Sequence, residues 1–192
     1  MGQQAVSKSG GIQAIVFLLG KKGLPNTTMQ ATLGALGNVA LNISMGKPTV
    51  VASAGLMPMI KFLSKRKTHP DVVAQAAKAL GNTAFGSQSV KARIMAEKAG
   101  PPLVARLIAA AVYARACRSG SQVVNDESGA KRDLAAESMA VTTQLCKTMT
   151  SLCLNRDNGR LFATFGILGG HIIFLLHFFC FFFCGAQNNR DS

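Results

Sequence analysis

The histidines and cysteines, the residues best suited to catalysis or metal binding, fit none of the common motifs. The three histidines, His69, His171 and His177, lie outside any H-E-x-x-H motif, the spacing that turns two imidazoles toward one zinc ion. The cysteines form no C-x-x-C pair, which argues against zinc and thioredoxin-like sites. They are Cys117, Cys146, Cys153, Cys180 and Cys184. We expect buried thiols in a reducing compartment.

A phosphate-binding loop is also missing. Gly46 and Lys47 match the end of such a motif, but its first glycine would have to be at position 41, which is leucine. We therefore expect a non-enzymatic protein that needs no metal and no cofactor.

Charge is strongly unbalanced along the chain. The 192 residues contain 21 lysines and arginines against 8 acids, a formal net charge of +13. Residues 1–118 contain 15 of the basic residues and two acids, Asp71 and Glu97, so the whole excess lies there. This asymmetry favours an acidic peptide, nucleic acid or an anionic membrane surface as partner. For residues 65–67 an equally good explanation is the end of a helix, where cations suit the helix dipole.

A first sequence block recurs at a fixed spacing. SGGIQAIVFLL at 9–19 aligns with AGLMPMIKFLS at 54–64 and with AGPPLVARLIA from residue 99, at intervals of 45 residues. A fourth copy, FGILGGHIIFLL, occupies 165–176. Self-similarity at such a period is the signature of a repeat architecture.

A second block recurs within the same period. LGALGNVALN at 33–42 aligns with AKALGNTAFG at 77–86, which places Asn38 opposite Asn82. A weaker copy is CKTMTSLCLN at 146–155, where serine replaces the asparagine. Two blocks that recur in the same order are unlikely to arise by chance.

Both blocks have the apolar spacing of α-helices. Apolar residues fall three and four positions apart, and glycine or proline breaks separate the blocks. The stripes are Ile12, Ile15, Val16 and Leu19; Leu56, Met59, Ile60 and Leu63; Leu33, Leu36 and Ala40; and Ala76, Leu80 and Ala84. No segment alternates convincingly as a strand. We predict an all-α fold, an α-solenoid, because one such unit cannot bury its apolar face without neighbours.

The pattern resembles the armadillo repeat. The resemblance rests on a recurrent glycine, on Leu-Leu-like helix ends and on an L-x-N motif in the third helix. These marks are Gly10, Gly55 and Gly100; Leu18-Leu19 and Phe62-Leu63; and Leu36/Asn38 and Leu80/Asn82. It covers about residues 5–176, most strongly the first hundred. It implies about three repeats in a right-handed superhelix, with HEAT repeats as the alternative that lacks the asparagine.

The expected units differ in length. Residues 1–45 form a partial first repeat, and 46–87 a second. The third covers 88–155 and contains an inserted loop at 119–133, SGSQVVNDESGAKRD, either a tolerated insertion or part of the binding face. Residues 156–192 begin a degenerate fourth repeat that continues into a Phe-rich tail.

The resemblance also implies a binding groove. In armadillo proteins the third helices line a concave face, and their asparagines bind the main chain of an extended peptide. An amide suits this role because it offers both a donor and an acceptor. We predict Asn38, Lys78 and Asn82 as the peptide-binding groove, with Lys61 and Arg93 as weaker candidates for a cation. The alternative is that each asparagine ties its helix to the neighbouring helix.

The charge indicates which peptide would bind. Importin-α proteins carry a tryptophan four residues before the asparagine, but here Gly34 and Lys78 stand at those positions and the chain has no tryptophan. A basic cargo would also be repelled. A β-catenin-like groove for an extended, acidic protein segment fits better. We therefore predict a protein-binding scaffold in the cytoplasm, with the nucleus as an alternative location.

The tail supports a different function. Residues 161–189 contain no charged side chain, and 167–186 is long enough to span a bilayer. One alternative is thus an armadillo adaptor held by a C-terminal membrane anchor, with the repeats in the cytosol. The competing interpretation takes 161–176 as a repeat helix followed by a truncated end.

Nucleic acid is the weaker alternative partner. The net charge favours it, but the basic half offers few aromatic platforms. They are Phe17, Phe62, Phe85 and Tyr113. Periodicity places the three phenylalanines in the core.

Overall fold

Helices make up most of the structure. The computed structural model describes residues 9–42, 46–117, 123–125, 131–154, 157, 158 and 160, and in this part the all-α fold class is confirmed. The elements are α2 (Gly11–Gly20), α3 (Asn26–Asn42), α4 (Gly46–Ala52), α5 (Leu56–Ser64), α6 (Pro70–Ala84), α7 (Gln88–Ala96), α8 (Gly100–Cys117), β1 (Val123–Asn125), β2 (Lys131–Asp133) and α9 (Leu134–Cys153).

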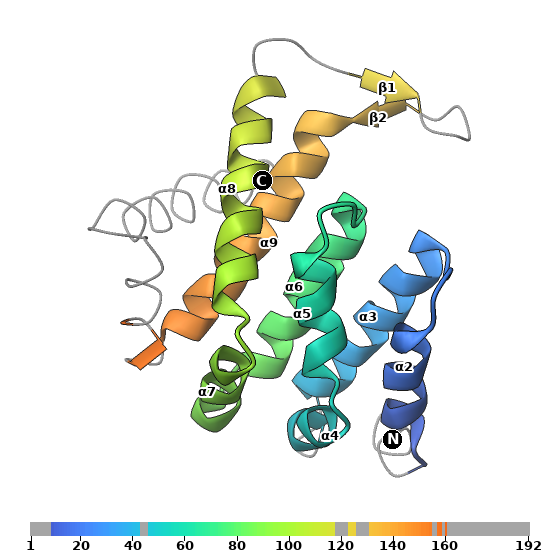
Figure 1. Ribbon diagram of the computed structural model, residues 1–192, viewed down its shortest axis with the longest axis vertical. Coiled ribbons are helices and arrows are strands. Elements are labelled where there is room, and N and C mark those ends of the chain that lie inside the picture. Colours follow the sequence, from blue (N-terminus) through green and yellow to red (C-terminus); the bar gives the residue numbers. More distant parts are fainter. Residues whose placement is uncertain are drawn as a thin grey trace, which may run out of the picture.

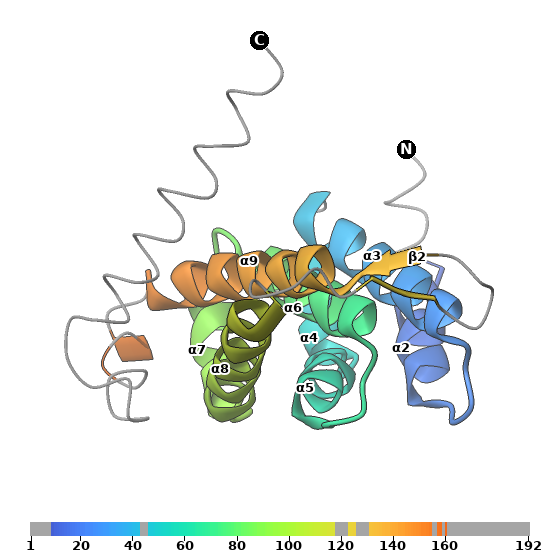
Figure 2. The same cartoon turned by 90° about the horizontal axis from the view of Figure 1, so that it is seen from above.

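The longer helices form two layers. Helices α3, α6 and α9 lie side by side in one layer, and α2, α5 and α8 lie across from them in the other (Figures 1 and 2). The short helices α4 and α7 precede α5 and α8 at one end of the layers (Figure 1). The same order of helices therefore occurs twice, as α4–α5–α6 and as α7–α8–α9. In each case a short helix is followed by one helix of the α2–α5–α8 layer and then by one of the α3–α6–α9 layer.

The predicted apolar stripes form the core. Most of their side chains are buried, and Ile15 and Val16 of α2 are half-buried against them. Leu33 and Leu36 of α3 and Leu80 of α6 are fully buried. This burial confirms the helical periodicity of the predicted stripes, because one face of each of these helices is removed from water.

Two glycines bring the helices of the α3–α6–α9 layer close together. A Cβ atom added to Gly37 would lie 2.9 Å from the Cα atom of Ala79, inside the contact distance of real side chains. A Cβ atom added to Gly81 would lie 3.0 Å from Oγ1 of Thr148. Each glycine directly precedes one of the recurrent asparagines. The L-G-N motif thus marks a close contact with the neighbouring helix in both copies.

Side chains satisfy several helix ends. His69 precedes α6, and its Nδ1 accepts a hydrogen bond from the backbone N–H of Asp71 at 3.3 Å, while Pro70 occupies the first helical position. Ser87 caps α7 in the same way through the backbone N–H of Val90. These caps pair amide groups that have no partner inside the helix.

Arg106 of α8 holds the end of α5. Its Nε donates to the carbonyl oxygen of Leu63 at 2.8 Å, and a terminal nitrogen donates to that of Arg66 at 3.4 Å. Burial lowers the pKa of the Arg106 guanidinium. A cation at a helix C-terminus is favourable, so this contact ties α8 to α5.

The inserted segment differs from the prediction. Residues 119–133 were expected to be a loop, but β1 and β2 form an antiparallel hairpin there, in which Val123 pairs with Asp133 and Asn125 with Lys131. Strands of three residues are too short for alternation to be visible in the sequence.

The predicted membrane segment at 167–186 lies outside the described residues, as does most of the expected fourth repeat. Among the helices that the structure describes, none combines the length and the apolarity needed to cross a membrane.

Candidate functional site

The predicted groove residues lie on the α3–α6–α9 layer. The side chains of Asn38 on α3 and Lys78 on α6 are exposed, and Lys147 is exposed on α9. Asn82 is half-buried, one helical turn beyond Lys78. These positions place two amides and two ammonium groups on three neighbouring helices.

Asn82 already has a partner in the neighbouring helix. Its Nδ2 donates to the backbone carbonyl oxygen of Gly37 at 3.3 Å. The bond spans the close contact between α6 and α3, so Asn82 ties the two helices together. It uses one of the two amide donors and does not engage the side-chain carbonyl oxygen. Asn38 occupies the same position of its own helix, but its side chain is exposed to solvent.

The next contact in the layer uses a different residue. Oγ1 of Thr148 on α9 donates to the carbonyl oxygen of Ala77 at 2.7 Å, and the side chain of Thr148 is buried. Ser151, which aligns with the asparagines, is half-buried on the same helix. The sequence alignment therefore identified the correct helices, but the polar link between α6 and α9 falls three residues earlier.

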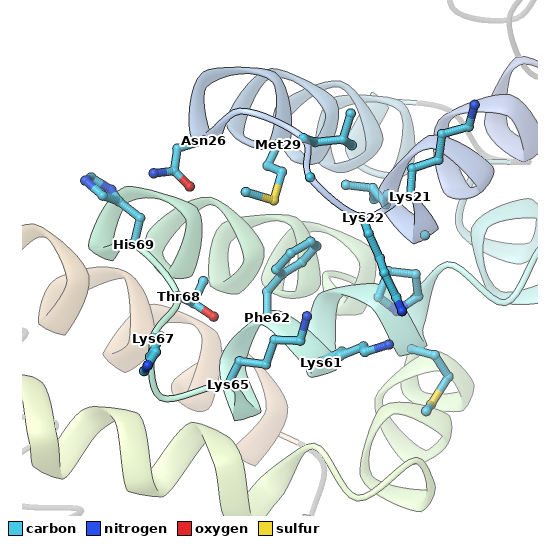
Figure 3. Close-up of a pocket in the computed structure, with 16 residues that line it drawn as sticks. Lys21, Lys22, Asn26, Met29, Lys61, Phe62, Lys65, Lys67, Thr68 and His69 are labelled. Atoms are coloured by element: carbon cyan, nitrogen blue, oxygen red, sulfur yellow. The ribbon is translucent and has the colours of Figure 1, made fainter.

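A lysine-lined cavity, which the sequence did not predict as a site, lies between α2 and α5 (Figure 3). Its volume is about 540 Å³. The basic residues around it are Lys21, Lys22, Lys61, Lys65 and Lys67. Lys61, a weaker candidate for a groove cation, therefore belongs to a different surface from Lys78. Apolar side chains, among them Leu19, Met29 and Phe62, form part of the wall, and Asn26, Thr68 and His69 also line it.

A repeat-level signal could have revealed this cavity. Lys21-Lys22 and Arg66-Lys67 follow the two copies of the first block 45 residues apart. Each pair comes just after a helix of the α2–α5–α8 layer. Basic residues at equivalent positions of adjacent stacked units are expected to gather at one end of that layer.

A second cavity of about 410 Å³ lies further along the same layer. Its charged lining residues carry both signs, since Arg66 and Arg106 share it with Glu137. Two of the three guanidinium nitrogens of Arg106 are already used as donors, to the carbonyl oxygens of Leu63 in α5 and of Arg66 just after it. This cavity is therefore less suited to a charged ligand than the lysine-lined one.

Two of the aromatic residues are not in the core. Phe62 is buried as predicted, but the side chains of Phe17 and Phe85 are 69% and 62% exposed. Phe17 lies next to the apolar stripe of α2 rather than within it, and Phe85 follows the last residue of α6. A lysine covers each ring, with Nζ of Lys21 5.2 Å from the centre of Phe17 and Nζ of Lys47 5.8 Å from that of Phe85. These cation–π contacts stabilise rings that the core does not hold.

The structure describes the surroundings of two cysteines, Cys146 and Cys153. Cys146 is buried, as predicted, and burial raises the pKa of the half-buried Cys153 thiol, which keeps the thiol protonated. Within the described residues, no three His, Cys, Asp or Glu side chains are grouped so that they could hold a metal ion. His171, His177, Cys180 and Cys184 lie outside the described residues.

Arg93, the other weak candidate for a groove cation, lies on α7 outside the α3–α6–α9 layer. A terminal nitrogen of its guanidinium contacts Oε1 of Glu97 at 2.7 Å. This pair is one turn apart on the helix surface, and it engages the charge of Arg93 within its own segment.

Comparison with known proteins assigns no family. No protein-family model matches the sequence, and no functionally characterised protein matches it.

Proposed function

We propose that this chain is a short armadillo-type solenoid with a right-handed superhelix, and that it acts as a non-enzymatic scaffold for other proteins. The exposed face of the α3–α6–α9 layer binds an extended, acidic segment of a partner. The observation that carries the proposal is the side-by-side packing of three helices that present Asn38, Lys78 and Lys147 to solvent.

The chemistry of this face suits a peptide main chain. A peptide that loses water on binding needs donors and acceptors for its amide groups, and unpaired groups would cost about 1–3 kcal/mol each. Asn38 can offer both kinds of group from its exposed amide. Asn82 can add its side-chain carbonyl oxygen while it continues to hold Gly37.

The charge of this face suits acidic partners. Within α3, α6 and α9 the acids are Asp71 and Glu137, each in the first turn of its helix. Lys78 and Lys147 lie in the middle or later part of α6 and α9. Exposed pairs with these lysines would contribute about 0.2–1 kcal/mol each. Charge would therefore act mainly on the rate of encounter and on the choice of partner.

Selection from a random peptide library tests this function without a known partner. A phage-displayed library of dodecapeptides is selected against the full chain and against the variant Asn38→Ala/Lys78→Glu. The matched control is Gln13→Ala/Lys98→Glu, which has the same net charge but moves both changes to exposed residues outside this face, on α2 and between α7 and α8. We expect acidic peptides that bind the wild type and the control and lose binding to the first variant. Equal binding to both variants contradicts the proposal.

Nucleic acid is a second candidate, because the structure exposes Phe17 and Phe85 beside lysines. Base stacking on an exposed ring is worth about 1–3 kcal/mol. Titration with a single-stranded 20-mer at several salt concentrations tests it. Tight binding that depends steeply on salt and is weakened by Phe17→Ala/Phe85→Ala would favour nucleic acid over an acidic peptide.

A further inference from the structure

The lysine-lined cavity concentrates positive charge in a small volume. Lys22, Lys61 and Lys65 extend toward the space between α2 and α5, while the side chains of Lys21 and Lys67 point away from it (Figure 3), that of Lys21 toward the ring of Phe17. All five are exposed, and among the residues that the structure describes no Asp or Glu belongs to the lining. Asp71 lies beside it, with Oδ2 3.7 Å from Nδ1 of the lining residue His69.

Helix dipoles do not neutralise this charge. The cavity borders the C-terminal ends of α2 and α5, each equivalent to about half a negative charge. It also borders the N-terminal ends of α3 and α6, which contribute about half a positive charge each. The four termini cancel to a first approximation. The lysines therefore exceed what capping the ends of α2 and α5 requires.

The apolar wall strengthens the effect of the lysines. Leu19 and Phe62 are buried beneath the cavity, and Met29 is half-buried. Such side chains form a wall of low dielectric constant, and clefts with one sign of charge over such a wall focus the electrostatic field. An anion held there is attracted more strongly than at an open surface.

The density of charge indicates the ligand. An extended peptide rises about 3.3 Å per residue and turns alternate side chains to one side, so carboxylates on that side lie about 6.6 Å apart with one charge each. A phosphate monoester carries about −1.5 to −2 at neutral pH. Two or three phosphates on one small ring thus balance the lysines within a cavity of about 540 Å³, whereas an acidic peptide cannot place enough carboxylates there.

We propose that the cavity between α2 and α5 binds a compact group that carries several phosphates, such as an inositol polyphosphate, either free or as a lipid headgroup. This site is separate from the α3–α6–α9 face and does not depend on the function proposed for that face. Lysine suits this role because its ammonium is a mobile point charge that can reach different phosphate oxygens.

The test titrates the full chain with inositol hexakisphosphate in 150 mM salt by calorimetry. The variant is Lys22→Gln/Lys61→Gln/Lys65→Gln, and the control is Lys47→Gln/Lys78→Gln/Lys98→Gln, which removes the same charge outside the cavity. All of these lysines except the half-buried Lys47 are exposed, and melting temperatures verify that both variants fold. We expect the cavity variant to bind at least about tenfold more weakly than wild type, and the control to stay within about twofold.

Vesicles distinguish the two sources of phosphate. Phosphatidylcholine vesicles with phosphatidylinositol bisphosphate are compared with phosphatidylserine vesicles of equal charge. Selective sedimentation with the first, lost in the cavity variant, assigns a lipid headgroup; binding of the soluble compound alone assigns a free ligand. Equal loss in both lysine variants, or no binding of either probe, overturns the proposal.

Discussion

The two contacts within the α3–α6–α9 layer each place a glycine against the neighbouring helix but use different polar links. Between α3 and α6, Gly37 faces Ala79 and the amide of Asn82 crosses to the carbonyl of Gly37. Between α6 and α9, Gly81 faces Thr148, whose hydroxyl crosses to the carbonyl of Ala77. The glycine is common to both contacts and the hydrogen-bonding side chain is not.

This difference separates the two parts of the repeated motif. The glycine allows close packing in both contacts. The side chain that forms the hydrogen bond across the contact can come from a different turn of the next helix, as Thr148 does in place of Ser151. Asn38 and Asn82 therefore differ in role despite their equivalent sequence positions. Asn82 holds its neighbour, and Asn38 presents its amide to solvent.

The largest effect is expected from Gly37→Ala. The new methyl group would meet the Cα atom of Ala79 in α6 at 2.9 Å, so the two helices have to move apart. Overpacking of this kind costs about 1–3 kcal/mol, and the better helix propensity of alanine recovers up to about 1 kcal/mol. We expect the free energy of unfolding in urea to fall by about 1–2 kcal/mol.

Gly34→Ala is the matched control in the same helix. The nearest atom to its new methyl group would be Oε1 of Gln75 at 4.0 Å, an ordinary contact. Helix propensity then dominates, and we expect a gain in stability of about 0.5–1 kcal/mol. A similar change in both variants would show that close packing at Gly37 is unimportant.

Thr148→Val tests the link between α6 and α9. The substitution keeps the shape of a buried side chain but removes the hydroxyl that donates to Ala77 at 2.7 Å. We expect a loss of about 1 kcal/mol in urea unfolding, the usual net value of one such bond. Thr150→Val on the exposed side of α9 should change little. An equal loss at both positions would argue against a specific link.

The smallest effects distinguish the two asparagines. Asn82→Ala removes the bond to Gly37, so we expect a net loss of up to about 1 kcal/mol after the gain in helix propensity. Asn38→Ala should be neutral or stabilise by up to about 0.5 kcal/mol, because its side chain is exposed. Thermal unfolding of both variants measures the difference. Equal losses would mean that Asn38 also has a structural partner.

Much of the fold could be predicted because its signals are local. The stripes through Leu33, Leu56 and Leu80 are buried as their spacing indicates, since helical periodicity lies within one segment. The prediction that Phe17 and Phe85 lie in the core is wrong. Phe17 lies beside the apolar stripe of α2 rather than within it, and Phe85 lies just after the end of α6. The hairpin of Val123–Asn125 and Lys131–Asp133 could not be predicted because strands of three residues carry no readable alternation.

The candidate sites were harder to predict because they combine distant segments. The alignment of Asn38 with Asn82 placed both residues at equivalent positions of α3 and α6, but it could not show that Asn82 bonds to Gly37, which depends on the distance between two helices. The lysine cavity brings Lys22 to Lys61 and Lys65 across two units. Net charge alone could not locate it, because charge says nothing about where side chains meet.

The most direct test follows the side-chain amide signals of Asn38 and Asn82 by NMR while a library-selected acidic peptide is added. We predict that the signals of Asn38 and of the backbone around Lys78 shift in a saturable way, while those around Lys22 and Lys61 stay in place. Shifts confined to the lysine cavity between α2 and α5, with Asn38 unchanged, would contradict the proposed peptide-binding face.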